Sequence, residues 1–252
     1  MKHWLEVLRP SNCQLIMQEI DLLRDKTHDL SELDKQKEWL LKAEQADVII
    51  STPPCSDFSR AKWANSRGPP PLRNKLYPRG FPWLSTFNRS KVEMNNNLIQ
   101  FNWKLASQTG KTKWQLFLSE HPEDLGRMPG GEPFATPASI WQSKEFQDLW
   151  EAGWWSGAFR QCEFGADTPK PTRMLASDHV FACFAPNCLP QFDSDGFYTG
   201  PVERCDHNHT VSLIRKPGDT GPFRTAEAAA YPSEMCKKIA QSIWFCFSFH
   251  TP

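Results

Sequence analysis

The sequence predicts an α/β fold built on a doubly wound, parallel, Rossmann-like sheet. Short apolar runs, several of them ended by proline, alternate along the chain with segments of helical periodicity, an order typical of parallel sheets covered by helices. The 252 residues are enough for one large domain, and a hydrophobic share of 39% excludes a globally disordered chain. No apolar run is long enough to predict a membrane span.

In the first half of the chain, apolar runs and capping residues predict two strands and two helices. Ser31 and Asp34 are spaced like a capping box, and leucines recur behind them at helical spacing. A β-branched run ends at Pro53 and Pro54, as a buried strand does. The expected elements are a strand at 14–19, a helix from Ser31, a strand at 47–51 and a helix at 91–107.

In the second half, the same signals predict three more strands and two helices. Thr136 followed by Pro137 is typical of a helix start, and Gly153 of a helix end. The expected elements are strands at 114–119, 154–164 and 172–177, and helices from Thr136 to Gly153 and at 233–247. Residues 1–177 are thus expected to form one domain, with a basic, proline-rich insertion at 60–113. Residues 178–252 add a loop-rich extension and a closing helix packed on the same domain.

The net charge of zero conceals an uneven distribution. Residues 60–113 hold 11 basic side chains and one acid, Glu93, whereas the segments before and after them are acidic. Cations interleaved with aromatic rings are typical of surfaces that contact phosphates and stack on bases. The alternative is a solvated loop whose aromatic side chains pack back on the domain. The residues predicted to bind nucleic acid are Arg60, Lys62, Arg67, Arg73, Lys75 and Arg79.

Two reactive side chains are expected at one edge of the sheet. Cys55 follows the strand at 47–51 behind two prolines, and Glu120 follows the strand at 114–119. The carboxyl ends of parallel strands meet at one edge, where α/β sheets bind ligands. A cysteine and a carboxyl there suit nucleophilic and acid–base catalysis. The alternatives are a small buried thiol and an ion-paired or capping carboxylate.

These two segments resemble motifs of the cytosine-5 DNA methyltransferase family. STPPCSDFS at 51–59 is similar to the nucleophile motif Pro-Cys-x-x-Phe-Ser, and SEHPEDLG at 119–126 to the motif that carries the acid. The resemblance implies that Cys55 adds to carbon 6 of cytosine, that Glu120 supplies a proton to nitrogen 3, and that Arg173 holds Glu120 or the base. It also implies a DNA substrate, with RNA not excluded, and so a nucleus or nucleoid. The base must leave the helix to reach the thiol.

The resemblance extends to the cofactor, S-adenosylmethionine. It implies that Glu19 or Asp21 holds the ribose, that Asp29 holds the adenine, and that Pro53 belongs to the same site, although Asp29 could equally cap a turn. The family's Phe-x-Gly-x-Gly loop is missing, since the first glycine is Gly68. We therefore expect the sheet to be incomplete at its N-terminal strand, the chain alone to bind the cofactor weakly, and an upstream segment or a partner to complete the pocket.

Other departures leave alternatives open. Ser56 follows the cysteine, His121 follows the acid, and Arg173 stands alone where the family has two arginines. One alternative is a catalytically inactive nucleic-acid-binding module derived from a methyltransferase. Another is an amino-methyltransferase. The motif of that family is Asp/Asn-Pro-Pro-aromatic, and residues Thr52 to Cys55 match it in part.

A second group of residues has the chemistry of zinc ligands. The eight cysteines are too sparse for a disulfide scaffold, so thiols or a metal site fit them better. Four of five side chains could surround a zinc ion, and the alternative is buried thiols with surface imidazoles. The five candidate ligands are Cys183, Cys188, Cys205, His207 and His209.

Overall fold

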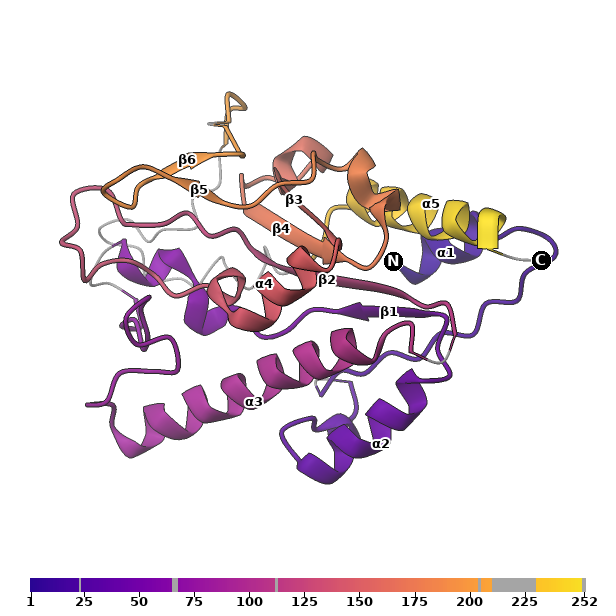
Figure 1. Ribbon diagram of the computed structural model, residues 1–252, viewed down its shortest axis with the longest axis horizontal. Coiled ribbons are helices and arrows are strands. Elements are labelled where there is room, and N and C mark those ends of the chain that lie inside the picture. Colours follow the sequence, from indigo (N-terminus) through magenta and orange to yellow (C-terminus); the bar gives the residue numbers. More distant parts are fainter. Residues whose placement is uncertain (23, 65–67, 112, 204, 210–229, 251–252) are drawn as a thin grey trace.

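The structure is a computed structural model that describes residues 1–22, 24–64, 68–111, 113–203, 205–209 and 230–250. Its centre is a four-stranded mixed sheet in the order β1-β2-β4-β3, with helices on both faces (Figure 1). The α/β class predicted from the sequence is confirmed. The strands are β1 (Val48–Ser51), β2 (Leu116–Pro122), β3 (Trp155–Arg160) and β4 (Pro171–Ala176).

The prediction of a fully parallel sheet is wrong for β4. Strands β1 and β2 are parallel, but β4 runs antiparallel to both β2 and β3. A parallel return needs a crossover of a dozen or more residues, usually a helix. The connection from β3 to β4 holds only ten residues, 161–170, with one short 3-10 helix at Gln161–Phe164. The chain therefore turns back as a hairpin.

The strand predicted at 14–19 does not form. This segment is irregular, and its side chains alternate between half-buried Leu15 and Met17 and exposed Gln14 and Ile16. The alternation that resembles a strand comes from packing on the core. A strand also needs a hydrogen-bonded neighbour, and among the described residues β1 pairs only with β2.

Alternating side chains of the strands build a core on each face of the sheet. Leu116, Leu118 and Met174 pack on one face beneath α1 and α5, and Phe117 and Leu175 point to the other, beneath α3 and α4. Figure 1 shows α1 and α5 on one side of the sheet and α2 and α3 on the other. The helices are α1 (Lys2–Val7), α2 (Leu33–Ala43), α3 (Thr86–Gln108), α4 (Lys144–Glu151) and α5 (Ser233–His250). Among the described helices, none has the length and apolar character that crossing a membrane requires.

Two helix starts differ from those predicted. α3 begins at Thr86 because the Ser85 side chain accepts a hydrogen bond from the backbone of Asn88, at 3.4 Å. The helix expected from Thr136 is replaced by a 3-10 turn, and α4 begins after a new cap, Ser143. The Thr136 hydroxyl donates to the carbonyl of Pro133 instead of capping a helix.

The C-terminal extension packs on the loop that follows β2. A small hairpin, β5 (Gln191–Phe192) and β6 (Tyr198–Gly200), contacts this loop through a bridge between Gly126 and Phe197. Gly126 has φ +61, and a Cβ atom there would lie 2.5 Å from the carbonyl oxygen of Gly196 and 2.8 Å from the Phe192 ring. Only glycine allows this close approach.

We expect Gly126→Ala to destabilise the fold more than Gly110→Ala. Both positions have positive φ, so both variants carry a backbone strain of roughly 1–2 kcal/mol. A Cβ at Gly110 meets nothing within 4 Å, whereas one at Gly126 meets backbone and ring atoms. Overpacking of this kind costs about 1–3 kcal/mol more, measurable by urea unfolding. Equal midpoints would show that the hairpin is not docked as described.

Candidate functional site

The two reactive side chains come from neighbouring parallel strands. Ser51 at the end of β1 pairs with Ser119 in β2, so the residues that follow both strands leave the same edge of the sheet. Glu120 lies one position beyond this pair. Cys55 lies four positions beyond it and precedes a 3-10 turn at Ser56–Phe58. The prediction that strands at 47–51 and 114–119 bring Cys55 and Glu120 close together is confirmed, but Glu120 lies within β2, which continues to Pro122, and not beyond its end.

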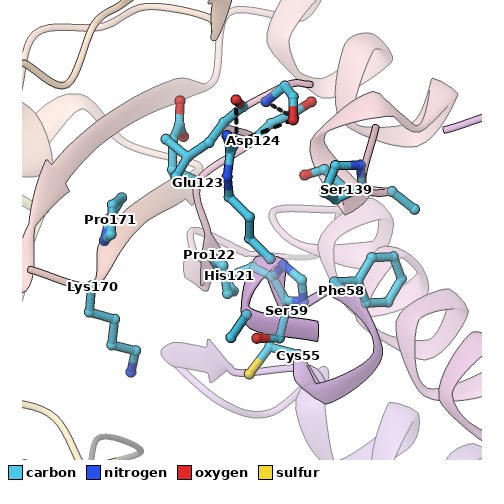
Figure 2. Close-up of a pocket in the computed structure, with 16 residues that line it drawn as sticks. Cys55, Phe58, Ser59, His121, Pro122, Glu123, Asp124, Ser139, Lys170 and Pro171 are labelled. Carbon is cyan, nitrogen blue, oxygen red and sulfur yellow. Dashed lines mark hydrogen bonds between the residues drawn. The ribbon is translucent and has the colours of Figure 1, made fainter. Parts of the chain in front are cut away.

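A pocket of about 210 Å³ opens beside Cys55. Its walls come from the Cys55 loop, the segment after β2, the segment before η4 (Ile140–Gln142) and the end of the connection between β3 and β4. Figure 2 shows Cys55 and Lys170 on one side of the pocket, with Glu123 and Asp124 across from them. The lining is mostly apolar, which is typical of sites that bind a flat organic ligand.

Glu120 is placed to hold a proton. The Tyr231 hydroxyl donates to its Oε2 at 2.6 Å, while Oε1 is buried with no hydrogen-bond partner among the described residues. Burial raises the pKa of the Glu120 carboxyl, although Tyr231 and Lys170 act in the opposite direction. Buried carboxylate oxygens usually have a partner, and Oε1 of Glu120 is an exception, although Glu120 is not among the residues that line the pocket beside Cys55.

Cys55 is a protonated thiol at neutral pH. Its side chain is accessible to solvent, yet the surrounding pocket walls raise the pKa of the thiol, and the nearby charge of Glu120 raises it further. Lys170 acts against both effects by stabilising the thiolate. The charges of Glu120 and Lys170 therefore both affect the pKa of the Cys55 thiol, so a substitution of either residue should change that pKa.

Arg173 does not contact Glu120, so the predicted role for this residue is wrong. Side chains opposite one another in an antiparallel pair share a face, and Glu120 lies opposite Met174, whereas Arg173 lies opposite His121. Arg173 is fully buried, and its guanidinium donates to Glu123 at 2.6 and 2.9 Å. The cation on the Glu120 side is Lys170, which the sequence analysis missed. Alternation along β4 is the signal that could have found it.

His121 is a neutral, buried side chain. Burial lowers its pKa to about 3, and the nearby Arg73 charge adds to this effect. Its ring meets the Phe58 ring edge-on, with centroids 5.2 Å apart. The histidine that departs from the family motif thus acts as a packing residue beneath the pocket.

Part of the basic segment is internal. Asp57, next to the Cys55 loop, accepts a hydrogen bond from Asn95 at 2.6 Å and forms ion pairs with Lys62 at 3.3 Å and Arg73 at 3.6 Å. Arg73 is 1% exposed, so the prediction that it contacts nucleic acid is wrong. A buried carboxylate is stable only when cations neutralise it. Lys62 and Arg73, which were predicted to bind nucleic acid at the surface, neutralise Asp57 instead.

Arg60 also connects two walls of the pocket by hydrogen bonds. Its guanidinium donates to the carbonyls of Leu125, Gly126 and Arg127, the last two at 3.2 and 3.0 Å. Lys75 and Arg79 are exposed, and their predicted contact with nucleic acid remains a prediction. Arg67 lies outside the described residues.

The residues predicted to hold S-adenosylmethionine do not line the pocket beside Cys55. Glu19 is exposed and pairs with Arg24, whose guanidinium also lies 4.0 Å from Asp21. Asp29 accepts hydrogen bonds from the backbone and hydroxyl of Ser31, at 2.9 and 2.6 Å, and so serves a local turn. Pro53 lies in the loop before Cys55. At the pocket beside Cys55, the four predicted residues therefore do not fit this cofactor.

The predicted metal ligands converge only in part. Cys205, His207 and His209 lie together, and the fourth member of their group is Cys162. These four side chains could hold a metal ion. Cys183 instead contacts the Ser242 hydroxyl at 3.4 Å, and Cys188 the carbonyl of Pro186 at 3.2 Å. The prediction was therefore wrong for these two cysteines, and sequence spacing gave no signal for Cys162.

Comparisons with models of protein families, with curated proteins and with solved structures found no match for this chain.

We expect Glu120→Gln to lower the pH at which Cys55 becomes reactive. A carboxylate beside a thiol raises the thiol pKa, so removal of the charge shifts thiolate formation to lower pH, and Lys170→Met shifts it higher. The measurement is the rate of iodoacetamide modification against pH, followed by mass spectrometry of the Cys55 peptide. Cys183, an exposed thiol in the same chain, is the internal reference. An unchanged Cys55 midpoint in Glu120→Gln would contradict the proposed coupling.

Proposed function

We propose that this protein is a cytosine-5 methyltransferase-like protein that activates cytosine by covalent addition of Cys55. The observation that carries the proposal is that an accessible thiol after β1 and a buried carboxyl in the adjacent parallel strand β2 interact electrostatically, with an apolar pocket beside the thiol. The reversal of β4 does not alter this arrangement, because β1 and β2 remain parallel. The motifs at 51–59 and 119–126 give the residue types that the family resemblance implies.

The chemistry begins with loss of the thiol proton to solvent through the open pocket. The Cys55 sulfur forms a bond to carbon 6 of the base, and the electrons of the carbon 5–carbon 6 double bond shift through carbon 4 toward nitrogen 3. Glu120, in the protonated form that its burial favours, gives its proton to nitrogen 3, so no charge remains on the ring. Carbon 5 then has the reactivity of an enamine and attacks an electrophile.

Each neighbouring polar group supports one of these steps. Lys170 favours the thiolate at Cys55, and burial of Glu120 keeps a proton available for nitrogen 3. The Tyr231 hydroxyl fixes Oε2 of Glu120, and the proposal assigns the proton for the base to Oε1. Lys170 and Tyr231 are thus positioning residues, whereas Cys55 and Glu120 are the catalytic residues.

S-adenosylmethionine is the methyl donor that the resemblance implies, and it would supply the electrophile at carbon 5. Because the residues predicted to hold it do not line the pocket beside Cys55, the roles of Cys55 and Glu120 concern only the base. The testable activity of the chain is therefore activation of carbon 5, which needs no methyl donor. A solvent deuteron can take the place of the methyl group.

We expect the protein to catalyse exchange of the carbon-5 hydrogen of cytosine with deuterium from solvent. Addition of Cys55 makes carbon 5 basic, so that it takes a deuteron from solvent. Loss of the original carbon-5 proton to solvent, together with elimination of the thiolate from carbon 6, re-forms the double bond and releases labelled cytosine. The measurement is the loss of the carbon-5 proton signal of a DNA oligonucleotide in deuterium oxide. Cys55→Ser should abolish exchange, and Glu120→Gln should slow it by roughly 10²–10⁴-fold, as for loss of a general acid.

Cys183→Ser is the matched control, because it removes an exposed thiol that does not line the pocket. Exchange at an equal rate in Cys55→Ser would remove Cys55 from the mechanism. A wild-type protein that binds the oligonucleotide without exchange would overturn the enzymatic proposal and support the nucleic-acid-binding module instead.

The same proposal assigns DNA contact to the exposed cations of the segment between β1 and α3. This segment follows the Cys55 loop in the sequence and leads to α3, the long helix on one face of the sheet (Figure 1). Lys75 and Arg79 are exposed there, and Arg89 follows at the start of α3. Phosphates bound by these residues would hold the strand that presents its base to Cys55.

We expect Lys75→Ala with Arg79→Ala to weaken binding to duplex DNA and to flatten its salt dependence. Each lost phosphate contact lowers the slope of log K against log salt concentration by about 0.9. Fluorescence anisotropy over a salt series measures this slope. Lys37→Ala, an exposed cation of α2, is the control and should leave it unchanged. An unaltered slope in the double variant would show that Lys75 and Arg79 do not touch phosphates.

A further inference from the structure

Four metal-binding side chains from two distant parts of the chain meet outside the pocket. Cys162 lies in the connection between β3 and β4, and Cys205, His207 and His209 follow β6. The Cys205 sulfur lies 3.4 Å from the Cys162 sulfur, 3.1 Å from Nδ1 of His207 and 3.2 Å from Nε2 of His209. All four ligand atoms lie within 4.8 Å of one another.

We propose that Cys162, Cys205, His207 and His209 bind one structural zinc ion. Two thiolates and two imidazoles are a ligand set that zinc prefers, and four protein ligands complete a tetrahedron. Zinc–sulfur bonds of about 2.3 Å and zinc–nitrogen bonds of about 2.0 Å place tetrahedral ligand atoms roughly 3.3–3.8 Å apart. The three distances from the Cys205 sulfur are close to this range, so small movements outward would admit the ion.

The surroundings of the four ligands support a metal site. Nδ1 of His209 lies 3.2 Å from the carbonyl of Asp167, a contact that orients the ring and leaves Nε2 for the metal. The backbone N–H of His207 donates to the Cys205 sulfur at 3.3 Å, which stabilises a thiolate there. The two sulfur atoms are also too far apart for a disulfide, whose bond length is about 2.05 Å.

The metal would fasten the extension to the wall of the pocket. One ligand, Cys162, stands at the start of the connection that ends in Lys170, and the backbone N–H of Gln161 donates to the Lys170 carbonyl at 3.3 Å. The other three ligands belong to the segment that follows β6, where Arg160 donates to the Glu203 carbonyl at 2.7 Å. Zinc would therefore fix the connection that carries the pocket lysine.

The test is the metal content of the full chain, purified without chelators and dialysed. We expect one zinc per chain by plasma mass spectrometry, and loss of this zinc in Cys205→Ser. Cys183→Ser and Cys188→Ser are matched controls, because they remove thiols that lie outside the group, and both should keep the zinc. A folded wild-type chain without zinc, or an oxidised Cys162–Cys205 pair in it, would overturn the proposal.

Two measurements on the wild type keep the proposal falsifiable should Cys205→Ser fail to fold. Cobalt exchanged into the site should give the visible absorption of a tetrahedral ion and the thiolate charge-transfer band, and the absence of both would overturn the proposal. Removal of the metal should also speed amide hydrogen exchange at 161–170 and 205–209 but leave β1 and β2 unchanged. Equal exchange with and without metal would show that zinc does not fasten these segments. None of these readouts depends on cytosine chemistry.

Discussion

The buried ion pair between Glu123 and Arg173 is the interaction on which the pocket depends. Its two N–H···O contacts of 2.6 and 2.9 Å tie the segment after β2 to β4, and both side chains are fully buried. Tyr198 of β6 donates to the same carboxylate at 3.2 Å, so the extension is fastened at the same point. Removal of one member of such a pair costs about 3–5 kcal/mol, because the other charge stays buried. Three separate segments therefore keep their places through one carboxylate.

Asp57 has a comparable part on the other side of Cys55. Lys62, Arg73 and Asn95 converge on it from the insertion and from α3, and Arg73 also stacks over the Phe58 ring at 4.2 Å. The Cys55 loop thus has two buried carboxylates near it, Asp57 neutralised by Lys62 and Arg73 and Glu123 neutralised by Arg173. Rigid supports of this kind place a reactive atom more accurately than a free loop does.

The sequence predicts those features that depend on neighbouring residues. β-branched or apolar runs ended by proline correctly predict β1 and β2, and with them the approach of Cys55 and Glu120. Features set by distant contacts were missed. The strand at 14–19 lacks a sheet neighbour, and the direction of β4 depends on the length of the connection before it.

The predicted roles of the site residues were likewise wrong where they depend on contacts between distant parts of the chain. Arg173 was misplaced because its role depends on which face of β4 it occupies, and Lys170 was missed for the same reason. Cys162 lies 43 residues from Cys205, a separation without a recognisable motif, so only the fold brings them together. Charge content alone predicted surface contact for Arg73, because composition does not distinguish a cation that faces solvent from one that faces a buried carboxylate.

The raised pKa of Cys55 has a consequence for the chemical durability of the protein. Peroxides and other oxidants attack thiolates much faster than thiols, and susceptibility to sulfenic acid formation follows thiolate character and exposure. Cys55 is accessible, but the pocket walls and Glu120 keep it protonated. An open pocket can therefore expose a thiol to solvent without early oxidative loss, since the raised pKa keeps the fraction of thiolate small.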